Sequence, residues 1–322
     1  MSEDEDKRVL TVQSHVVHGY VGNKAATFPL QLLGWEVDAL NAVQFSNHTG
    51  YGSVHGYRLD DDSITDIYAG LKEQKFHYNA LLTGYLPSAS AVKAVGRIGA
   101  DLKEHNLEFV WLLDPVMGDE GSMYVKPDVV PAYKAILKTH GLVTIVTPNY
   151  YEVELITGIK LKTKEDVLKA LHVLHTVFAI PHVVISSLPH PSDPGKLLTV
   201  GSSAGAVGAG LDRHLERIGP VFAISQEKFD TYFTGTGDLF AALLLDNYFR
   251  LGPTKLADAT VETVNTLRKV LKKTWQYSRK HNAAKVRMNN SAMRFHELRL
   301  VQNANLLKDH DEPGDVSWEA YA

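Results

Sequence analysis

The chain has 322 residues, of which 44% are hydrophobic and 22% charged, an ordinary composition for a globular protein. It contains no cysteine, so disulfide frameworks, cysteine-ligated metals and cysteine nucleophiles are excluded, and we expect a cytoplasmic protein. The formal net charge of −4 argues against a nucleic-acid partner, and no apolar run is long enough to span a membrane.

Strand-like and helix-like segments alternate along the chain. In chain order we expect a strand over 8–13, a helix over 23–33, a strand over 35–43, a helix over 62–73, a strand over 80–83, a helix over 88–105, a strand over 109–113, a helix over 127–139, a strand over 142–146, a helix over 164–177 and a strand over 182–185. Because parallel strands need crossover helices, this order predicts an α/β fold with a mostly parallel central sheet and helices on both faces.

The remaining segments complete the predicted organisation. Residues 189–210 are rich in Pro, Ser and Gly and are expected to form a loop. We expect one domain over residues 1–307, followed by an acidic, flexible tail over 308–322.

Polar side chains recur where the predicted strands end. They are Ser14, Asp114, Asp119, Thr147, Asn149, Ser186 and Ser187. A single Asp-Pro or Thr-Pro is usually just a turn, but ligands of open α/β sheets bind outside the carboxyl ends of the strands. Several such polar ends therefore predict one shared crevice.

Gly235, Thr236, Gly237 and Asp238 stand directly before the apolar run 239–245. The glycines permit a tight turn, and the run predicts a buried helix whose unpaired N–H groups attract an anion. An acidic side chain beside an anion site is suited to accept a proton from a hydroxyl group during phosphoryl transfer. The structural alternative is that Asp238 only caps a core helix.

Several motifs together resemble the pyridoxal kinases. They are Gln13–Asn23, Val43–Tyr51, Leu82–Tyr85, Asp114–Asp119, Gly121–Val125, Thr147–Asn149, the Gly235 turn and Met293–Gln302. The turn alone marks the wider ribokinase-like superfamily, whereas the segments around Ser14 and from Phe45 to Tyr51 are more specific. The resemblance implies a three-layer ribokinase-like fold and a homodimer.

The activity that the resemblance implies is transfer of the γ-phosphoryl group of ATP to the 5′-hydroxyl of pyridoxal, pyridoxine or pyridoxamine, in vitamin B6 salvage. Asp238 would be the base, and the N–H groups of Gly235, Thr236 and Gly237 would stabilise the moving phosphoryl group.

The same resemblance implies contacts with ATP and metal ions. Asp119 and Glu152 would place Mg²⁺ through waters, since Mg²⁺ keeps much of its hydration shell. The monovalent cation, usually K⁺, would be surrounded by Asp114, Thr147 and Ser186. The implied ATP contacts are Asn149, Ser187, Asp114, Ser186 and Thr236.

A small flat pyridine ring needs apolar walls and a few hydrogen-bonding groups. The resemblance assigns Ser14 and Thr49 to the ring edge. It assigns Val21, Val43, Phe45 and Tyr85 to the walls, with Tyr85 stacked on a face. Val43 fits a core strand equally well, whereas Phe45 lies past the predicted strand end.

Two departures and three alternatives accompany this interpretation. The segment Asp119–Gly121 is shorter than is usual in the family, and Ser186–Ser187 replaces a common Thr-Ser pair. Hydroxymethylpyrimidine kinases share the fold and a similar ring substrate. A binding protein that has lost catalysis is a second alternative, against which the intact Asp238 argues. A nicotinamide oxidoreductase is disfavoured because no Gly-x-Gly-x-x-Gly follows the first strand.

Overall fold

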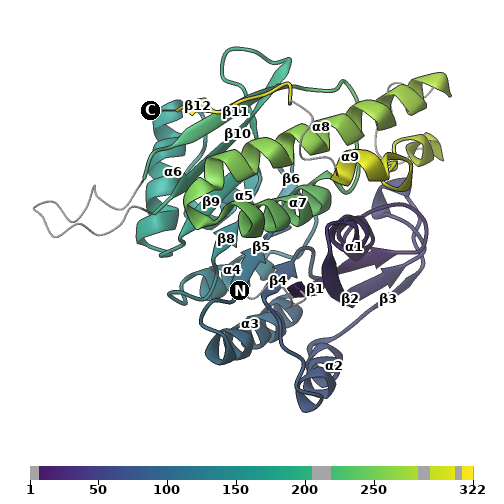
Figure 1. The fold of residues 1–322 in the computed structure, drawn as a ribbon, viewed down its shortest axis with the longest axis vertical. Helices are drawn as coiled ribbons and strands as arrows, with labels where there is room; N and C mark the ends of the chain where they lie inside the picture. The colour runs from purple at the N-terminus through teal and green to yellow at the C-terminus, as the bar shows by residue number, and fades with distance from the viewer. Residues whose placement is uncertain (1–6, 205–218, 282–290, 309–313, 322) are drawn as a thin grey trace, which may run out of the picture.

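A computed structural model describes residues 7–204, 219–281, 291–308 and 314–321 (Figure 1). Across these ranges one sheet has ten strands in the order β12-β11-β10-β9-β8-β5-β4-β1-β2-β3. Its strands are β1 (Lys7–Val16), β2 (Trp35–Phe45), β3 (Gly56–Arg58), β4 (Ala80–Thr83), β5 (Val110–Leu113), β8 (Ile145–Val146), β9 (His182–Pro189), β10 (Lys196–Ser203), β11 (Phe222–Glu227) and β12 (Glu319–Ala320). A separate hairpin joins β6 (Gly118–Asp119) to β7 (Ser122–Met123).

The centre of the sheet is parallel and its two edges are antiparallel. β2, β1, β4, β5, β8 and β9 pair in parallel, while β3 at one edge and β10, β11 and β12 at the other run antiparallel. The predicted mostly parallel sheet is confirmed.

Helices cover both faces of this sheet. The helices of the described chain are α1 (Asn23–Leu32), α2 (Asp61–Glu73), α3 (Ala89–His105), α4 (Val129–Leu137), α5 (Tyr150–Thr157), α6 (Lys164–Thr176), α7 (Thr236–Leu251), α8 (Leu256–Lys280) and α9 (Ala304–Lys308). Short 3₁₀ turns are η1 (Thr49–Tyr51), η2 (Pro253–Lys255), η3 (Ser291–Phe295) and η4 (Val301–Asn303). One core lies under α2 to α6, and the other under α1, α7, α8 and α9. Figure 1 shows α7 and α8 side by side over the sheet.

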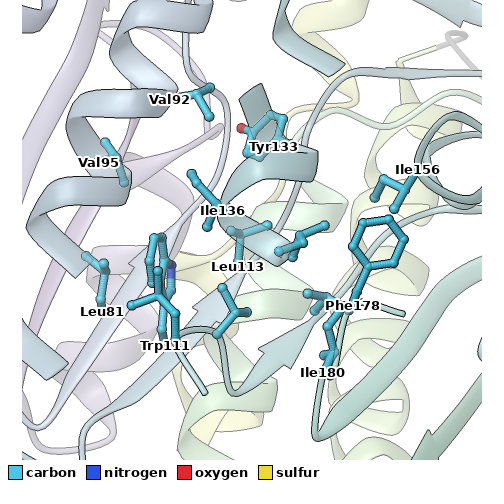
Figure 2. Close-up of a cluster of buried hydrophobic side chains, with 14 of the residues drawn as sticks. Leu81, Val92, Val95, Trp111, Leu113, Tyr133, Ile136, Ile156, Phe178 and Ile180 are labelled. Atoms are coloured by element: carbon cyan, nitrogen blue, oxygen red, sulfur yellow. The ribbon is translucent and has the colours of Figure 1, made fainter. Parts of the chain in front are cut away.

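The two cores follow from alternation along the central strands. On β5, Trp111 and Leu113 face the core under α3 and α4, whereas Val110 and Leu112 face the core under α7. Figure 2 shows Trp111 and Leu113 in the first of these cores. Successive strand residues point to opposite faces, so a strand covered on both faces must be apolar throughout.

Three strands run further along the chain than the sequence predicts. Ser14 lies within β1 rather than after it, at a shift in register beside β2. Ser186 and Ser187 lie within β9, which outruns β8 because antiparallel β10 supplies its backbone partners. Phe45 is the last residue of β2, not a residue past its end. These side chains still lie at the carboxyl edge of the parallel strands.

The predicted loop over 189–210 is wrong for much of its length. Lys196–Ser203 form β10, which pairs with β9 and β11, and residues 205–210 lie outside the described part. In the tail, residues 309–313 and 322 also lie outside it. Glu319 and Ala320 pair with Ala223 and Phe222 at the sheet edge, so this part of the predicted tail adds a short strand to the sheet. In the part of the chain that the structure covers, no helix is both long and apolar enough to cross a membrane.

Candidate active site

The glycine turn begins α7, as its sequence predicts. Gly235 is the N-cap residue and has φ 76°, a left-handed conformation that favours glycine. A Cβ at this position would come 2.0 Å from the carbonyl oxygen of Tyr20, so the loop after β1 packs directly on the turn. Thr236 and Gly237 then start the helix, whose first N–H groups have no partner within the helix. The turn therefore presents N–H donors beside the loop that follows β1.

Asp238 lies in the first turn of α7 and is partly buried. Burial raises the pKa of its carboxyl group, and the backbone N–H of Gly22 opposes this shift. Gly22 belongs to the loop after β1, and it contacts both the Asp238 carboxylate and Ser14 of that strand. A raised pKa makes the carboxylate a better proton acceptor near neutral pH.

Asp114 lies opposite the glycine turn. It follows β5, is 7% exposed, and one of its carboxylate oxygens would be 3.5 Å from a Cβ on Gly237. Burial, followed by the charges of Glu152 and Asp238, raises the pKa of Asp114 well above its usual range. Three carboxyl groups from separate segments thus share one region, where bound cations would relieve their repulsion.

Glu152 and Asn149 form a capping box at the start of α5, a helix that the sequence analysis did not predict. Glu152 accepts hydrogen bonds from the backbone N–H groups of Asn149 and Met117, both at 2.9 Å. Burial raises the pKa of Glu152 to about 8, although these N–H groups lower it. The Asn149 side chain accepts from Glu152 N–H and donates to the carbonyl of Gly118 at 2.7 Å. Both side chains therefore hold the loop 117–118 against α5.

Asp119 lies on the β6–β7 hairpin, where the short segment noted in the sequence forms a tight turn. Glu120 and Gly121 have φ of 48° and 79°, as in a two-residue hairpin turn. Burial raises the pKa of Asp119. No three His, Asp or Glu side chains among the described residues are close enough to hold a metal ion directly.

Thr147 follows β8, which lies between β5, the strand that Asp114 follows, and β9, the strand that contains Ser186. The Oγ1 atom of Thr147 is buried and has no hydrogen-bond partner among the described residues. The Ser186 hydroxyl donates to the carbonyl of Pro148 at 3.4 Å. An unpaired buried oxygen is costly, and an oxygen-coordinated cation would satisfy it.

The predicted ring walls gather in one small cluster apart from the two main cores. Val21, Val43 and Phe45 pack there with Val16, and Tyr85 and Val54 border it. All four predicted wall residues are thus brought together, although they come from three segments of the chain. Val43 lies within β2 and is fully buried in this cluster, as the core-strand alternative predicts, and its role as a ring wall stays a prediction.

The two predicted ring-edge residues have different surroundings. Ser14 packs against Gly22, where a Cβ would come 2.5 Å from the Ser14 Oγ and 2.0 Å from its carbonyl oxygen. Thr49 begins η1 and is exposed. His48 caps η1 by accepting the Gly50 N–H at 3.0 Å, so this histidine organises the loop.

Three further residues at the site were not singled out from the sequence. The Tyr124 and Tyr232 hydroxyls hydrogen-bond near Asp119, and burial raises the pKa of Tyr124. Glu297 accepts hydrogen bonds from the backbone N–H of Tyr20 and from the hydroxyl of Tyr51. All but Tyr232 lie in segments that carry the family resemblance, which is the one signal that could have found them.

Comparison with known proteins gives consistent similarities. The profile of the family described as phosphomethylpyrimidine kinase matches residues 34–285. The chain is 42% identical to the pyridoxal kinase of Homo sapiens, with 95% of this chain and 96% of the relative covered. The pyridoxal kinase of Arabidopsis thaliana is 40% identical over 83% of this chain and 82% of its own length.

Solved structures show the same similarity. Pyridoxal kinase from Leishmania donovani in complex with ADP has a TM-score of 0.85 and 32% identity, covering 98% of this chain and 99% of that one. The same enzyme with ADP and pyridoxine has a TM-score of 0.83 at 32% identity, covering 98% of this chain and 100% of that one.

Proposed function

Because the chain belongs to the phosphomethylpyrimidine kinase family and, within it, to the pyridoxal kinases, we propose that it phosphorylates vitamin B6. The γ-phosphoryl group of ATP is transferred to the 5′-hydroxyl of pyridoxal, pyridoxine or pyridoxamine. The pyridoxal kinase from Leishmania donovani binds ADP together with pyridoxine or pyridoxamine, which supports a nucleotide and a B6 vitamer as the two substrates of this chain.

The observation that carries the proposal is the position of Gly22. Its α-carbon packs on Ser14 at the edge of the apolar cluster, and its N–H faces the carboxylate of Asp238. The apolar cluster that we propose holds the ring and the carboxylate that we propose as the base are therefore neighbours across one glycine. A hydroxymethyl group on a ring held in that pocket is suited to meet the base and the glycine turn together.

In the proposed mechanism Asp238 accepts the proton of the 5′-hydroxyl as the hydroxyl oxygen bonds to the γ-phosphorus. The bond from the γ-phosphorus to the β–γ bridging oxygen breaks, and ADP leaves. The N–H groups of Gly235, Thr236 and Gly237 stabilise the charge that develops on the transferred phosphoryl group. Ser14 and Thr49 orient the ring, which Val21, Val43, Phe45 and Tyr85 enclose.

Metal ions and ATP belong to the same proposal. Asp119 and Glu152 would hold Mg²⁺ through waters, and Asp114, Thr147 and Ser186 would surround K⁺ or another monovalent cation. These cations would neutralise phosphate charge during transfer. Asn149, Ser187, Asp114, Ser186 and Thr236 would contact ATP. Two observations support a cation near Asp114 and Thr147. The Thr147 Oγ1 atom is unpaired, and the carboxyl groups of Asp114 and Glu152 lie close enough to repel each other.

We propose a single kinase domain over residues 1–307, a homodimer and a cytoplasmic location. Gel filtration with light scattering tests the dimer, and expression of residues 1–307 alone tests the domain.

Formation of pyridoxal 5′-phosphate by the purified chain with ATP and Mg²⁺ tests the activity. We expect product with pyridoxal and a much lower kcat/KM with hydroxymethylpyrimidine. Greater turnover of the pyrimidine would assign the chain to the alternative kinase, and binding without turnover would assign it to the binding proteins.

A further inference from the structure

We infer that Glu297 is a positioning residue that holds three loops of the active site in one arrangement, an inference that rests on the proposed function. Glu297 follows η3 in a C-terminal segment of the chain. It belongs to neither the ring pocket nor the phosphate region described above. Its carboxylate instead connects the segments that carry the proposed ring-binding residues to the segment that carries the glycine turn.

The contacts of Glu297 define this role. Its Oε2 atom accepts hydrogen bonds from the backbone N–H of Tyr20 at 2.9 Å and from the Thr234 hydroxyl at 3.5 Å. Its Oε1 atom accepts from the hydroxyl of Tyr51 at 2.8 Å. These donors lie 277, 63 and 246 positions away along the chain, so one carboxylate gathers three distant segments.

Each of these segments supplies part of the proposed chemistry. Tyr20 precedes Val21, which belongs to the apolar cluster, and Gly22, whose N–H faces Asp238. Tyr51 ends η1, which begins at Thr49. Thr234 directly precedes Gly235, the first residue of the glycine turn. The carboxylate therefore sets the distance between ring, base and phosphate donors.

Gly19 shows how closely the carboxylate is fitted. A Cβ on Gly19 would come 2.5 Å from the carboxylate carbon and from both oxygens of Glu297, and its φ of +93° favours glycine. The loop after β1 thus approaches the carboxylate with its backbone. The carbonyl group of Tyr20, in the same loop, packs against Gly235.

A charged acceptor is needed at this position. A carboxylate only accepts hydrogen bonds and binds several donors strongly, whereas a glutamine side chain has one acceptor oxygen and an NH₂ group that would oppose a donor. Burial, followed by the charge of Glu297, raises the pKa of Tyr51, so its hydroxyl stays protonated as a donor. Glu297→Gln keeps the side-chain size and removes this pattern of acceptors.

The test compares Glu297→Gln with Asp101→Asn by steady-state kinetics. Asp101 also accepts a tyrosine hydroxyl, that of Tyr68 at 2.7 Å, but it joins α2 to α3 near the end of α3. A misplacement of reacting groups by about 1 Å can lower the reaction rate roughly 100-fold. We therefore expect Glu297→Gln to lose roughly 10- to 100-fold in kcat/KM for pyridoxal. We expect KM for ATP to change by less than about twofold and the Asp101→Asn enzyme to keep wild-type kinetics.

Hydrogen exchange gives a readout that does not depend on kinase activity. In Glu297→Gln we expect faster amide exchange in residues 19–22, 48–52 and 231–236, with unchanged exchange in α3 and α6. Should the wild-type chain fail to phosphorylate pyridoxal, the proposed function fails, yet the exchange pattern still tests the loop arrangement.

Milder variants keep the inference testable if Glu297→Gln does not fold. Tyr51→Phe removes one donor and should raise KM for pyridoxal, while Thr234→Val should lower kcat. Each effect should vanish when combined with Glu297→Asp, because the shorter side chain already leaves these donors unpaired. Wild-type kinetics and wild-type exchange in the folded variants would overturn the role of Glu297.

Discussion

The carbonyl oxygen of Tyr20 lies against the α-carbon of Gly235, where an added Cβ would come within 2.0 Å of it. The loop after the first strand and the turn before α7 are thus packed backbone on backbone. This contact places the loop that carries Val21 and Gly22 directly beside the glycine turn. Gly235 also has a positive φ, so both its conformation and its close contact require glycine.

We expect Gly235→Ala to lose activity severely. The left-handed conformation alone costs an alanine about 1–2 kcal/mol, and the Tyr20 loop must also move away. Because that loop carries Val21 and Gly22, kcat/KM for pyridoxal should fall by roughly 100-fold or more. Kinetics and urea denaturation measure the two effects.

Gly252→Ala is the matched control at the other end of α7. Gly252 has a φ of +89°, but nothing lies within 4 Å of the site of its Cβ. With a ψ of 160°, this conformation is one that glycine alone adopts readily, so the alanine should cost about 1–3 kcal/mol of stability while leaving kcat/KM unchanged. Equal activity losses in the two variants would mean that the Tyr20 contact has no role in catalysis.

Asp238→Asn should fold and bind ATP but lose roughly 10²- to 10⁴-fold in kcat, the usual contribution of a general base. Calorimetry measures ATP binding and a coupled assay measures turnover. Asp258→Asn is the control, because Asp258 is an acidic residue in the first turn of the next helix, α8. If Asp238→Asn turns over pyridoxal about as fast as the control does, Asp238 is not the general base.

The crevice should divide into a ring side and a nucleotide side. Ser14→Ala combined with Thr49→Ala should raise KM for pyridoxal roughly ten-fold, since each neutral hydrogen bond contributes about 0.5–1.5 kcal/mol, with little change for ATP. Asn149→Ala should raise KM for ATP and leave KM for pyridoxal unchanged. Varying one substrate at a time separates the two effects.

Asn149 also caps α5, so its variant needs a stability control. Thr163 forms the equivalent capping box on α6, away from the site. Thr163→Ala should lose about 1 kcal/mol of stability, as Asn149→Ala should, while leaving both KM values unchanged. If Asn149→Ala affects ATP no more than Thr163→Ala does, its nucleotide contact is refuted.

Stability should decline in acid because of His182. Burial, with a smaller effect of His175, lowers the pKa of His182 to about 4. The folded state therefore holds this ring neutral, and its Nδ1 contacts the Ser203 hydroxyl at 2.9 Å. The unfolded chain takes up a proton near pH 6.5, so this contribution is complete above that pH and is lost as the pH falls toward 4.

Urea denaturation at pH 7.5 and pH 5 tests this dependence. We expect the free energy of unfolding of the wild-type chain to fall more between the two conditions than that of His182→Gln. A residual decline should persist in the variant, because burial also lowers the pKa of His175. Identical declines in both proteins would show that His182 does not contribute.

The sequence was sufficient for the alternating layers and for the glycine turn. Apolar alternation and helical periodicity are local properties, so they predicted the central strands and most of the helices. The antiparallel β10 was missed because Pro, Ser and Gly surround it and its stability comes from β9 and β11. α5 was missed because its short span is defined by the capping box of Asn149 and Glu152.

For the candidate site, the sequence by itself determined which residue types are present, and the resemblance suggested their roles. Only the tertiary structure decided which of them meet. Tyr20 and Glu297 are 277 positions apart, and no local pattern predicts that the N–H of one binds the carboxylate of the other. Such contacts form because packing two cores onto one sheet brings the ends of distant strands and helices to the same edge, where backbone groups without strand partners must find others.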